Sequence, residues 1–299
     1  MSDLQFESKG LILTDSPCTV DMDDGKPSRW GLSLVLAGFG GFILWAILAP
    51  LDAGVVANAT DGHTLLLSDL GALAVSPLVA KDLPFKPEQL KGVTMLAYSP
   101  HILAVHPSVP ANTLTELVKW LAEQPQTVRY GTSGVGNQPH LWAELLRARL
   151  NMKMENVAYK GVADTLRDVL AGHVPIIIDV VLPTGNHVAA GRLKGICVAS
   201  PERSSICPTV PTVGELGMKD MESAVFYGLV APAGVPRPII DRLNALVQEA
   251  IKDPAVVKKY SDLGFFMTGS TPEAYLEKLK FETERWTKVV KDNNIKVEG

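Results

Sequence analysis

The chain has 299 residues, enough for two lobes that each bury a core. Hydrophobic residues make up 46% and charged residues 20%, which excludes a disordered chain and a charge-rich coiled coil. The net charge of −4, without any basic block, argues against nucleic acid as a partner. Three scattered cysteines exclude a disulfide-knit scaffold and a cysteine-rich zinc site.

The first feature along the chain is an uncharged stretch at residues 30–49. As a helix it would be roughly 30 Å long, which matches the hydrocarbon core of a bilayer. Lys26 and Arg29 precede it, so we predict a transmembrane helix with a cytoplasmic tail at residues 1–29. A cleaved secretory signal is the alternative, because residues 57–59 have the small-x-small form of a cleavage site. A buried core helix is a third interpretation, but nothing upstream would surround it.

The exported part begins near residue 61 and alternates strands with amphipathic helices. Thr113 and Glu116 form a predicted capping box at the start of the first of these helices. Such alternation predicts βαβ units on a parallel sheet, and hence an α/β fold. The predicted strands are residues 64–67, 102–105, 128–130, 155–158, 174–181 and 194–199.

Beyond residue 201 the alternation of strands and helices gives way to loops that contain several prolines. One helix is predicted after Pro236 and Pro238. The last helix begins at Thr271, with Pro272 in the first turn, where a helix tolerates proline.

The glycine-rich turn at residues 131–136 is the strongest candidate for a binding site. It lies between a predicted strand and helix, so backbone N–H groups and the hydroxyls of Thr132 and Ser133 meet at the positive end of the helix. That combination suits an anion such as a carboxylate, and a plain tight turn is an equally weighted alternative. A nucleophile elbow on Ser133 fails because Val135 replaces its second glycine, which argues against a hydrolase. A dinucleotide fingerprint fails because Pro139 stands where its third glycine belongs.

Three further residues have positions that suggest a site. His140 follows the glycine turn, although a histidine at a helix start is more often structural. Asp179 and Tyr159 each end a predicted strand, where ligands bind in open α/β sheets. Asp179 has loop capping as an equal alternative. The six histidines show no metal-ligand spacing, so the sequence supports neither a metal nor a cofactor. Cys197 and Cys207 are candidates for a disulfide or for buried free thiols.

Several motifs in order resemble the periplasmic solute-binding proteins of tripartite tricarboxylate transporters, the Bug-type receptors. They are residues 61–66, 130–136, 159–161, 208–213, 228–234, 269–273 and 288–296. The resemblance implies a two-lobed, Venus-flytrap fold of the type II periplasmic binding proteins, which captures a small organic carboxylate and performs no chemistry. It also implies membrane permease subunits as partners and a periplasmic location. Residues 61–100 and 226–299 would then form lobe I, and residues 101–225 lobe II.

Residue by residue, the resemblance implies that Ser68, Asp69, Thr132, Ser133, Gly134, Tyr159 and Asp179 line the cleft. Asp69 departs from the small polar residues usual there, and an acid facing an anionic ligand would repel it unless paired.

The front of the chain departs from the family, because the first strand, loop, helix and second strand expected before residue 61 are missing. In their place, residues 28–57 resemble the membrane anchor of haemolysin-D-type membrane fusion proteins. The sequence thus predicts an anchored receptor with an N-terminally truncated lobe I. A binding-incompetent hybrid and a membrane-anchored secretion adaptor are the alternatives.

Overall fold

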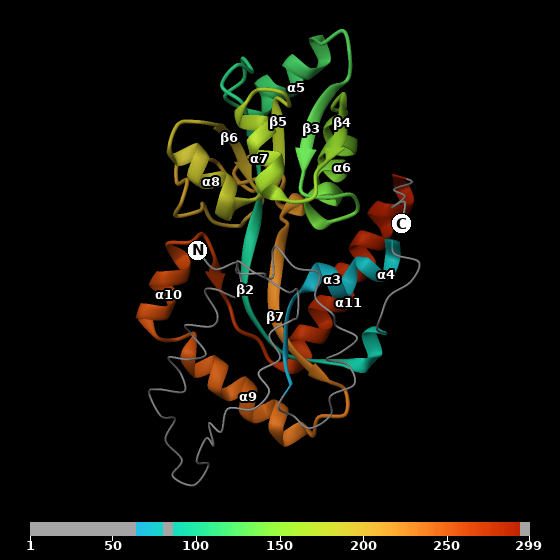
Figure 1. The fold of residues 1–299 in the computed structure, drawn as a ribbon, viewed down its shortest axis with the longest axis vertical. Coiled ribbons are helices and arrows are strands. Elements are labelled where there is room, and N and C mark those ends of the chain that lie inside the picture. The colour runs from blue at the N-terminus through green and yellow to red at the C-terminus, as the bar shows by residue number, and fades with distance from the viewer. Residues whose placement is uncertain (1–63, 80–85, 294–299) are drawn as a thin grey trace, which may run out of the picture.

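The computed structural model describes residues 64–79 and 86–293, which form two lobes joined by long strands (Figure 1). We call the lobe at the top of Figure 1 the upper lobe and the other the lower lobe. The predicted anchor at residues 30–49 lies outside the described residues. Within the described ranges, no helix has the length and apolar character needed to cross a bilayer.

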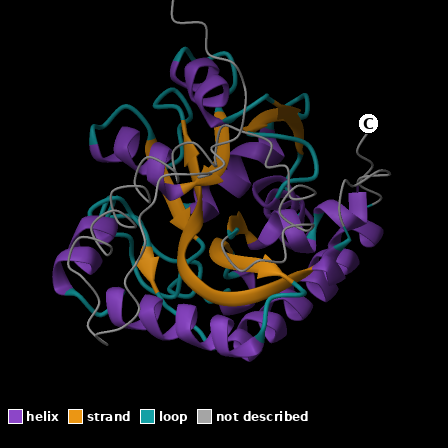
Figure 2. Ribbon diagram, turned by 60° about the horizontal axis from the view of Figure 1, so that its bottom comes forward, coloured by secondary structure: helices purple, strands orange, loops and turns teal. Residues whose placement is uncertain are grey.

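The strands, in chain order, are β1 (Leu66–Asp69), β2 (Leu90–Val105), β3 (Val128–Thr132), β4 (Met154–Ala158), β5 (Ile176–Val180), β6 (Lys194–Val198), β7 (Ala224–Pro232) and β8 (Phe266–Met267). The α-helices are α3 (Leu70–Ala74), α4 (Ser76–Val79), α5 (Leu114–Glu123), α6 (Gln138–Leu150), α7 (Val162–Leu170), α8 (Val181–Ala189), α9 (Arg237–Ala250), α10 (Pro254–Ser261) and α11 (Pro272–Asp292). Two short 3₁₀ turns, η1 (Pro87–Gln89) and η2 (Lys219–Met221), complete the described elements. Figure 2 shows the helices lying outside the strands of both lobes.

The strand β2 belongs to both lobes. Its first part pairs antiparallel with β7 in the lower lobe, from Leu90 opposite Pro232 to Pro100 opposite Ala224. From His101 onward it pairs antiparallel with β5 and β6 in the upper lobe. β1 and β8 complete the lower sheet, and β3 and β4 the upper one.

The upper sheet is mixed, so the prediction of a parallel sheet is only partly correct. β3 pairs parallel with β4 and β5, as βαβ connections require. β2 is antiparallel to β5 and β6 because it enters the upper sheet from the other lobe. The alternation of strands and helices along the sequence does not reveal this entry. The predicted strand at residues 64–67 is found shifted to Leu66–Asp69.

Local signals place several helix starts correctly. Thr113 accepts a hydrogen bond from the backbone N–H of Glu116 at 3.2 Å, as the predicted capping box requires. The Glu116 carboxylate bonds the N–H of Asn112 instead of that of Thr113. Thr271 caps α11 by accepting from Ala274 N–H at 3.1 Å, with Pro272 in the first turn.

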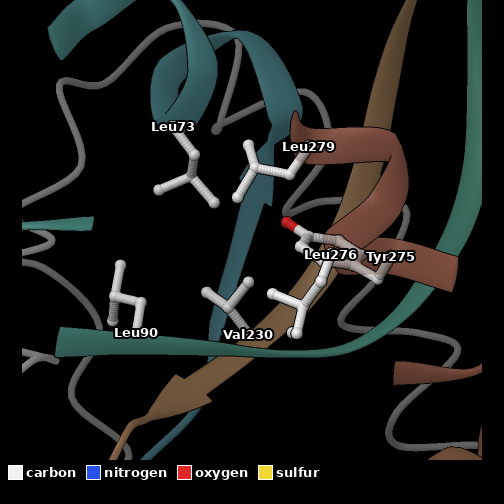
Figure 3. Close-up of a pocket in the computed structure, with 7 residues that line it drawn as sticks. Leu73, Leu90, Val230, Tyr275, Leu276 and Leu279 are labelled. Carbon is white, nitrogen blue, oxygen red and sulfur yellow. The ribbon is translucent and has the colours of Figure 1, made fainter. Parts of the chain in front are cut away.

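The largest hydrophobic core surrounds Tyr130 and Trp142, both fully buried, and continues from the upper lobe to Val75 of the α3–α4 segment and Trp286 of α11. In the lower lobe, the ring of Tyr275 lies over Gly92 and Gly228, and a Cβ at either glycine would overlap it. Figure 3 shows Tyr275 among the leucine side chains of a cavity of ≈ 10 Å³. That cavity is apolar and too small for a carboxylate ligand.

Cys197 and Cys207 are both buried free thiols in the structure. Burial raises the pKa of Cys197 to about 12 and that of Cys207 to about 11, so both thiols stay protonated. Of the two alternatives that the sequence leaves open, the structure therefore shows the free thiols.

Candidate functional site

The turn between β3 and α6 is held by hydrogen bonds among its own residues. Asn137 caps α6 by accepting from the His140 N–H at 3.0 Å, and its amide donates to the Ser133 hydroxyl oxygen at 3.1 Å. The Gly136 N–H donates to His140 Nδ1 at 2.9 Å. Gly136 has φ 72°, in the left-handed region that glycine adopts without a Cβ penalty. The glycine turn of the sequence is thus a fixed loop at the positive end of a 13-residue helix.

Asp179, on the neighbouring strand β5, stabilises this turn through hydrogen bonds. It lies at the end of β5 with 1% of its surface exposed. One carboxylate oxygen accepts from Ser133 N–H at 3.0 Å and the other from Val180 N–H at 2.8 Å. Burial raises the pKa of Asp179 to about 6, although these hydrogen bonds act in the opposite direction. The strand-end carboxylate therefore positions the turn and occupies one of its backbone donors.

Thr132 and Tyr159 lie next to each other at the ends of β3 and β4. The Tyr159 N–H donates to the Thr132 carbonyl at 2.9 Å, and Asn156 donates to the buried Thr132 hydroxyl at 3.0 Å. The Tyr159 hydroxyl donates to Asp168 of α7 at 2.9 Å. Burial and Asp168 together raise the pKa of Tyr159 to about 12. The Tyr159 ring flanks Gly131 of β3, but its hydroxyl bonds α7.

The lower lobe contributes Ser68 and Asp69 at the end of β1. Ser68 is buried, and its hydroxyl donates to the Asp69 carbonyl at 2.9 Å. A Cβ built on Gly71, just after β1, would lie 2.9 Å from Asp69 Oδ1 and equally close to the side chain of Gln138. Gln138 is the first residue of α6 in the upper lobe. The end of β1 therefore approaches the glycine turn across the space between the lobes.

The hydroxyl of Tyr227 interacts electrostatically with both Asp69 and Asp179. It lies opposite Asp69 in the β1–β7 pairing and is buried. Burial raises the pKa of its hydroxyl, and the charges of Asp69 and Asp179 raise it further. Both carboxylates are thus near this hydroxyl, so a negative field is present beside the turn.

Sequence reasoning missed Asn137, Gln138, Asn156 and Tyr227. Asn137 carries a recognisable signal, since Asn before a helix is a preferred N-cap. Gln138, Asn156 and Tyr227 carry no such signal, because their positions depend on contacts between segments distant in sequence.

The arrangement around Ser133 does not build a nucleophile. Its hydroxyl oxygen accepts from Asn137, while His140 Nδ1 accepts from the backbone. Burial lowers the pKa of His140, which favours its neutral form. Among residues 64–79 and 86–293, no three His, Cys, Asp or Glu residues gather in a way that would hold a metal ion.

Residues 49–295 match the sequence profile of a family described as "Tripartite tricarboxylate transporter family receptor". The chain belongs to this receptor family. The family consists of substrate-binding receptors and not of enzymes. One relative is "UPF0065 protein in tcbD-tcbE intergenic region" of Pseudomonas sp. (strain P51), 33% identical over 85% of this chain and 74% of that protein. Another is "Protein BugT" of Bordetella pertussis, 31% identical over 80% of this chain and 74% of that protein.

Solved receptors share the α/β periplasmic binding protein fold. A protein titled "R. palustris Rpa4515 with adipate" superimposes with a TM-score of 0.77 at 25% identity, covering 90% of this chain and 94% of that one. A second, "MatC (Rpa3494) from Rhodopseudomonas palustris with bound malate", gives a TM-score of 0.67 at 26% identity, over 80% and 83% of the two chains. The likeness to this receptor family, inferred from the sequence motifs, is therefore confirmed.

A short stretch resembles a different protein. Over 63 residues the chain is 67% identical to "Proteases secretion protein PrtE" of Dickeya chrysanthemi. This stretch is 20% of the chain and 14% of the secretion protein, so it supports the predicted resemblance to a secretion-protein anchor only weakly.

Proposed function

We propose that this receptor captures a small di- or tricarboxylate, or a related organic acid, between its two lobes and delivers it to the membrane permease of a tripartite tricarboxylate-type transporter. One observation carries the proposal. The glycine turn at the positive end of α6 faces the end of β1 from the other lobe, with Gln138 and Asp69 both against Gly71. The family match and the adipate and malate in the titles of the two solved relatives support a carboxylate as ligand.

The negative field beside the turn restricts where such a ligand can bind. Asp179 already accepts the Ser133 N–H, so the ligand carboxylate belongs on the opposite, helix side of the turn. The Thr132 hydroxyl and the backbone at Gly134 would border that position, whereas both the N–H and the hydroxyl of Ser133 interact with Asp179. Ser68 and Asp69 would close it from the lower lobe.

The receptor would act in the periplasm, anchored in the inner membrane by residues 30–49. Its lobe I would consist of residues 61–100 and 226–299, and its lobe II of residues 101–225. Lobe I would lack the first strand, loop, helix and second strand of the family. The change of β2 partners between Pro100 and His101 supports the boundary proposed at residues 100 and 101.

Calorimetric titration of the full chain in a mild detergent tests the function. C4–C6 di- and tricarboxylates are expected to bind saturably. Ser133→Ala should weaken binding about tenfold, because it removes the hydroxyl that bonds Asn137 and Asp179 and so holds the turn in place. Ser108→Ala is the matched control, since that hydroxyl contacts His106 at the far side of the upper lobe. Folded protein that binds none of these acids would contradict the proposal.

The second candidate is a binding-incompetent hybrid of a secretion-protein anchor and a receptor. The match of 63 residues to a secretion protein favours it. It predicts a cooperative unfolding transition with no shift on adding any acid of the panel, which the same titrations would reveal.

A further inference from the structure

Gln138 has a buried amide that the fold leaves without hydrogen bonds. The residue is 4% exposed. Neither its Oε1 nor its Nε2 has a hydrogen-bond partner among the residues that the structure describes. The neighbouring polar groups, in contrast, do have hydrogen-bond partners. Ser133, Asn137 and His140 bond one another, and Asp179 accepts from the Ser133 N–H.

Such an amide is costly in the ligand-free protein. A buried donor or acceptor without a partner costs about 1–3 kcal/mol, and most buried polar groups in native proteins are paired. Packing does not require an amide there, since Met or Leu fills a similar volume without the cost. A function that uses both atoms of the amide explains why the position carries glutamine.

The position of Gln138 indicates what the partner is. The residue stands in the first turn of α6, directly after the glycine turn. Its Cδ and Oε1 lie against Gly71 of the lower lobe, where an added Cβ would be 2.9 Å away. The amide thus reaches from one lobe to the other, at the place where the proposed ligand would lie.

We propose that Gln138 determines ligand specificity by binding a carboxylate that carries a hydrogen-bond donor, hydroxyl or ammonium, on a neighbouring carbon. This inference rests on the proposed function. Nε2 would donate to a ligand carboxylate oxygen, and Oε1 would accept from the neighbouring donor. An unsubstituted diacid satisfies Nε2 alone and leaves Oε1 buried without a partner, which disfavours it.

The test compares malate and aspartate with succinate, which has the same carbon chain but no donor. Titration of the full chain should show at least one substituted acid binding about tenfold more tightly than succinate, the effect of one buried hydrogen bond. In Gln138→Met the ratio of the affinity for that acid to the affinity for succinate should fall to about one. The melting temperature of ligand-free Gln138→Met should stay the same or rise, because an unpaired amide is removed.

Two further variants complete the design. Gln124→Met is the matched control, because that glutamine lies in the same lobe at the end of α5 and donates to the Trp120 carbonyl. It should keep the preference for the substituted acid. Gln138→Glu should weaken the binding of all three acids, since it replaces the donor with a negative charge. It provides the test if Gln138→Met does not fold.

The outcomes separate the two proposals. Equal binding of all three acids to the natural chain would overturn the role of Gln138 and leave the receptor function intact. An unchanged preference in Gln138→Met would do the same. Folded natural protein that binds no carboxylate of any kind would overturn the receptor function itself, and the role of Gln138 with it.

Discussion

At the scale of single residues, Asp179 fixes the glycine turn from the neighbouring strand. Its carboxylate is fully buried and is held by two backbone N–H groups, one of them in the glycine turn. The burial raises its pKa to about 6, so near neutral pH it carries most of a negative charge. The carboxylate therefore stabilises the turn and also places beside it a negative charge, which would repel an anion bound there.

From the raised pKa of Asp179 we predict that the stability of the protein depends on pH. Because the pKa of Asp179 in the folded state is above its unfolded value of 3.8, its contribution is fully present below that value and is lost as the pH rises through about 6. The free energy of unfolding of the natural chain should therefore fall, relative to Asp179→Asn, by about 1 kcal/mol between pH 5 and pH 8. Urea unfolding of both proteins at the two pH values measures this difference. A constant difference would show that Asp179 does not titrate in this range.

At the scale of elements, helix α6 connects the candidate site to the crossing between the lobes. Its N-terminus carries the glycine turn, and one turn later the buried Trp142 donates from Nε1 to the Met221 carbonyl at 2.9 Å. The same ring stacks on His101, with centroids 5.7 Å apart, where β2 changes lobes. From the lower lobe, Arg285 of α11 donates to the Glu222 carbonyl at 2.8 Å. Adjacent carbonyls of the crossing segment are thus held by helices from opposite lobes.

Loss of the tryptophan N–H should loosen this crossing. Trp142→Phe keeps an aromatic ring against His101 but leaves the buried Met221 carbonyl without its donor, so we expect a loss of about 1–3 kcal/mol in the free energy of unfolding. Urea denaturation measures the loss. Trp120→Phe is the control, because Trp120 is half-buried on α5. Equal, small losses in both variants would contradict a special role for Trp142.

For the whole molecule, the arrangement predicts closure on binding. The described lobes are joined through β2, through the packing of α11 on α6, and through the segment before β7, where Ser223 accepts from the His101 N–H and donates to the Ala199 carbonyl. A ligand that bridges the α6 turn and the end of β1 binds the closed form more tightly and shifts the population towards it. At 100 times its dissociation constant it should also add about 2.7 kcal/mol of stability.

Small-angle scattering and thermal unfolding check this prediction. The radius of gyration should fall and the melting temperature should rise when the chain is saturated with the carboxylate that binds best. Ser133→Ala at the same acid concentration serves as the weak-binding comparison. Saturable binding without a change in scattering would mean that the ligand is held by one lobe.

The sequence by itself determined the local parts of this protein. The caps at Thr113 and Thr271, the glycine turn and the existence of β3 and β5, with ends one or two residues away from those predicted, follow from residue preferences that act over a few positions. The family also followed from the sequence, because its motifs are short and ordered along the chain. The predicted site residues stay predictions, although the structure does bring Thr132, Ser133, His140 and Asp179 together.

The tertiary structure decided the rest. β2 was predicted only from residue 102, because residues 90–101 include Gly92 and Pro100 and owe their extended form to pairing with β7. β7 was missed in a proline-rich region for the same reason, whereas α10 was missed although Asp253 caps it and Pro254 stands in its first turn. The unpaired amide of Gln138 and its approach to Gly71 join positions 67 residues apart. Contacts of that kind depend on how the lobes pack, and local propensity carries no information about them.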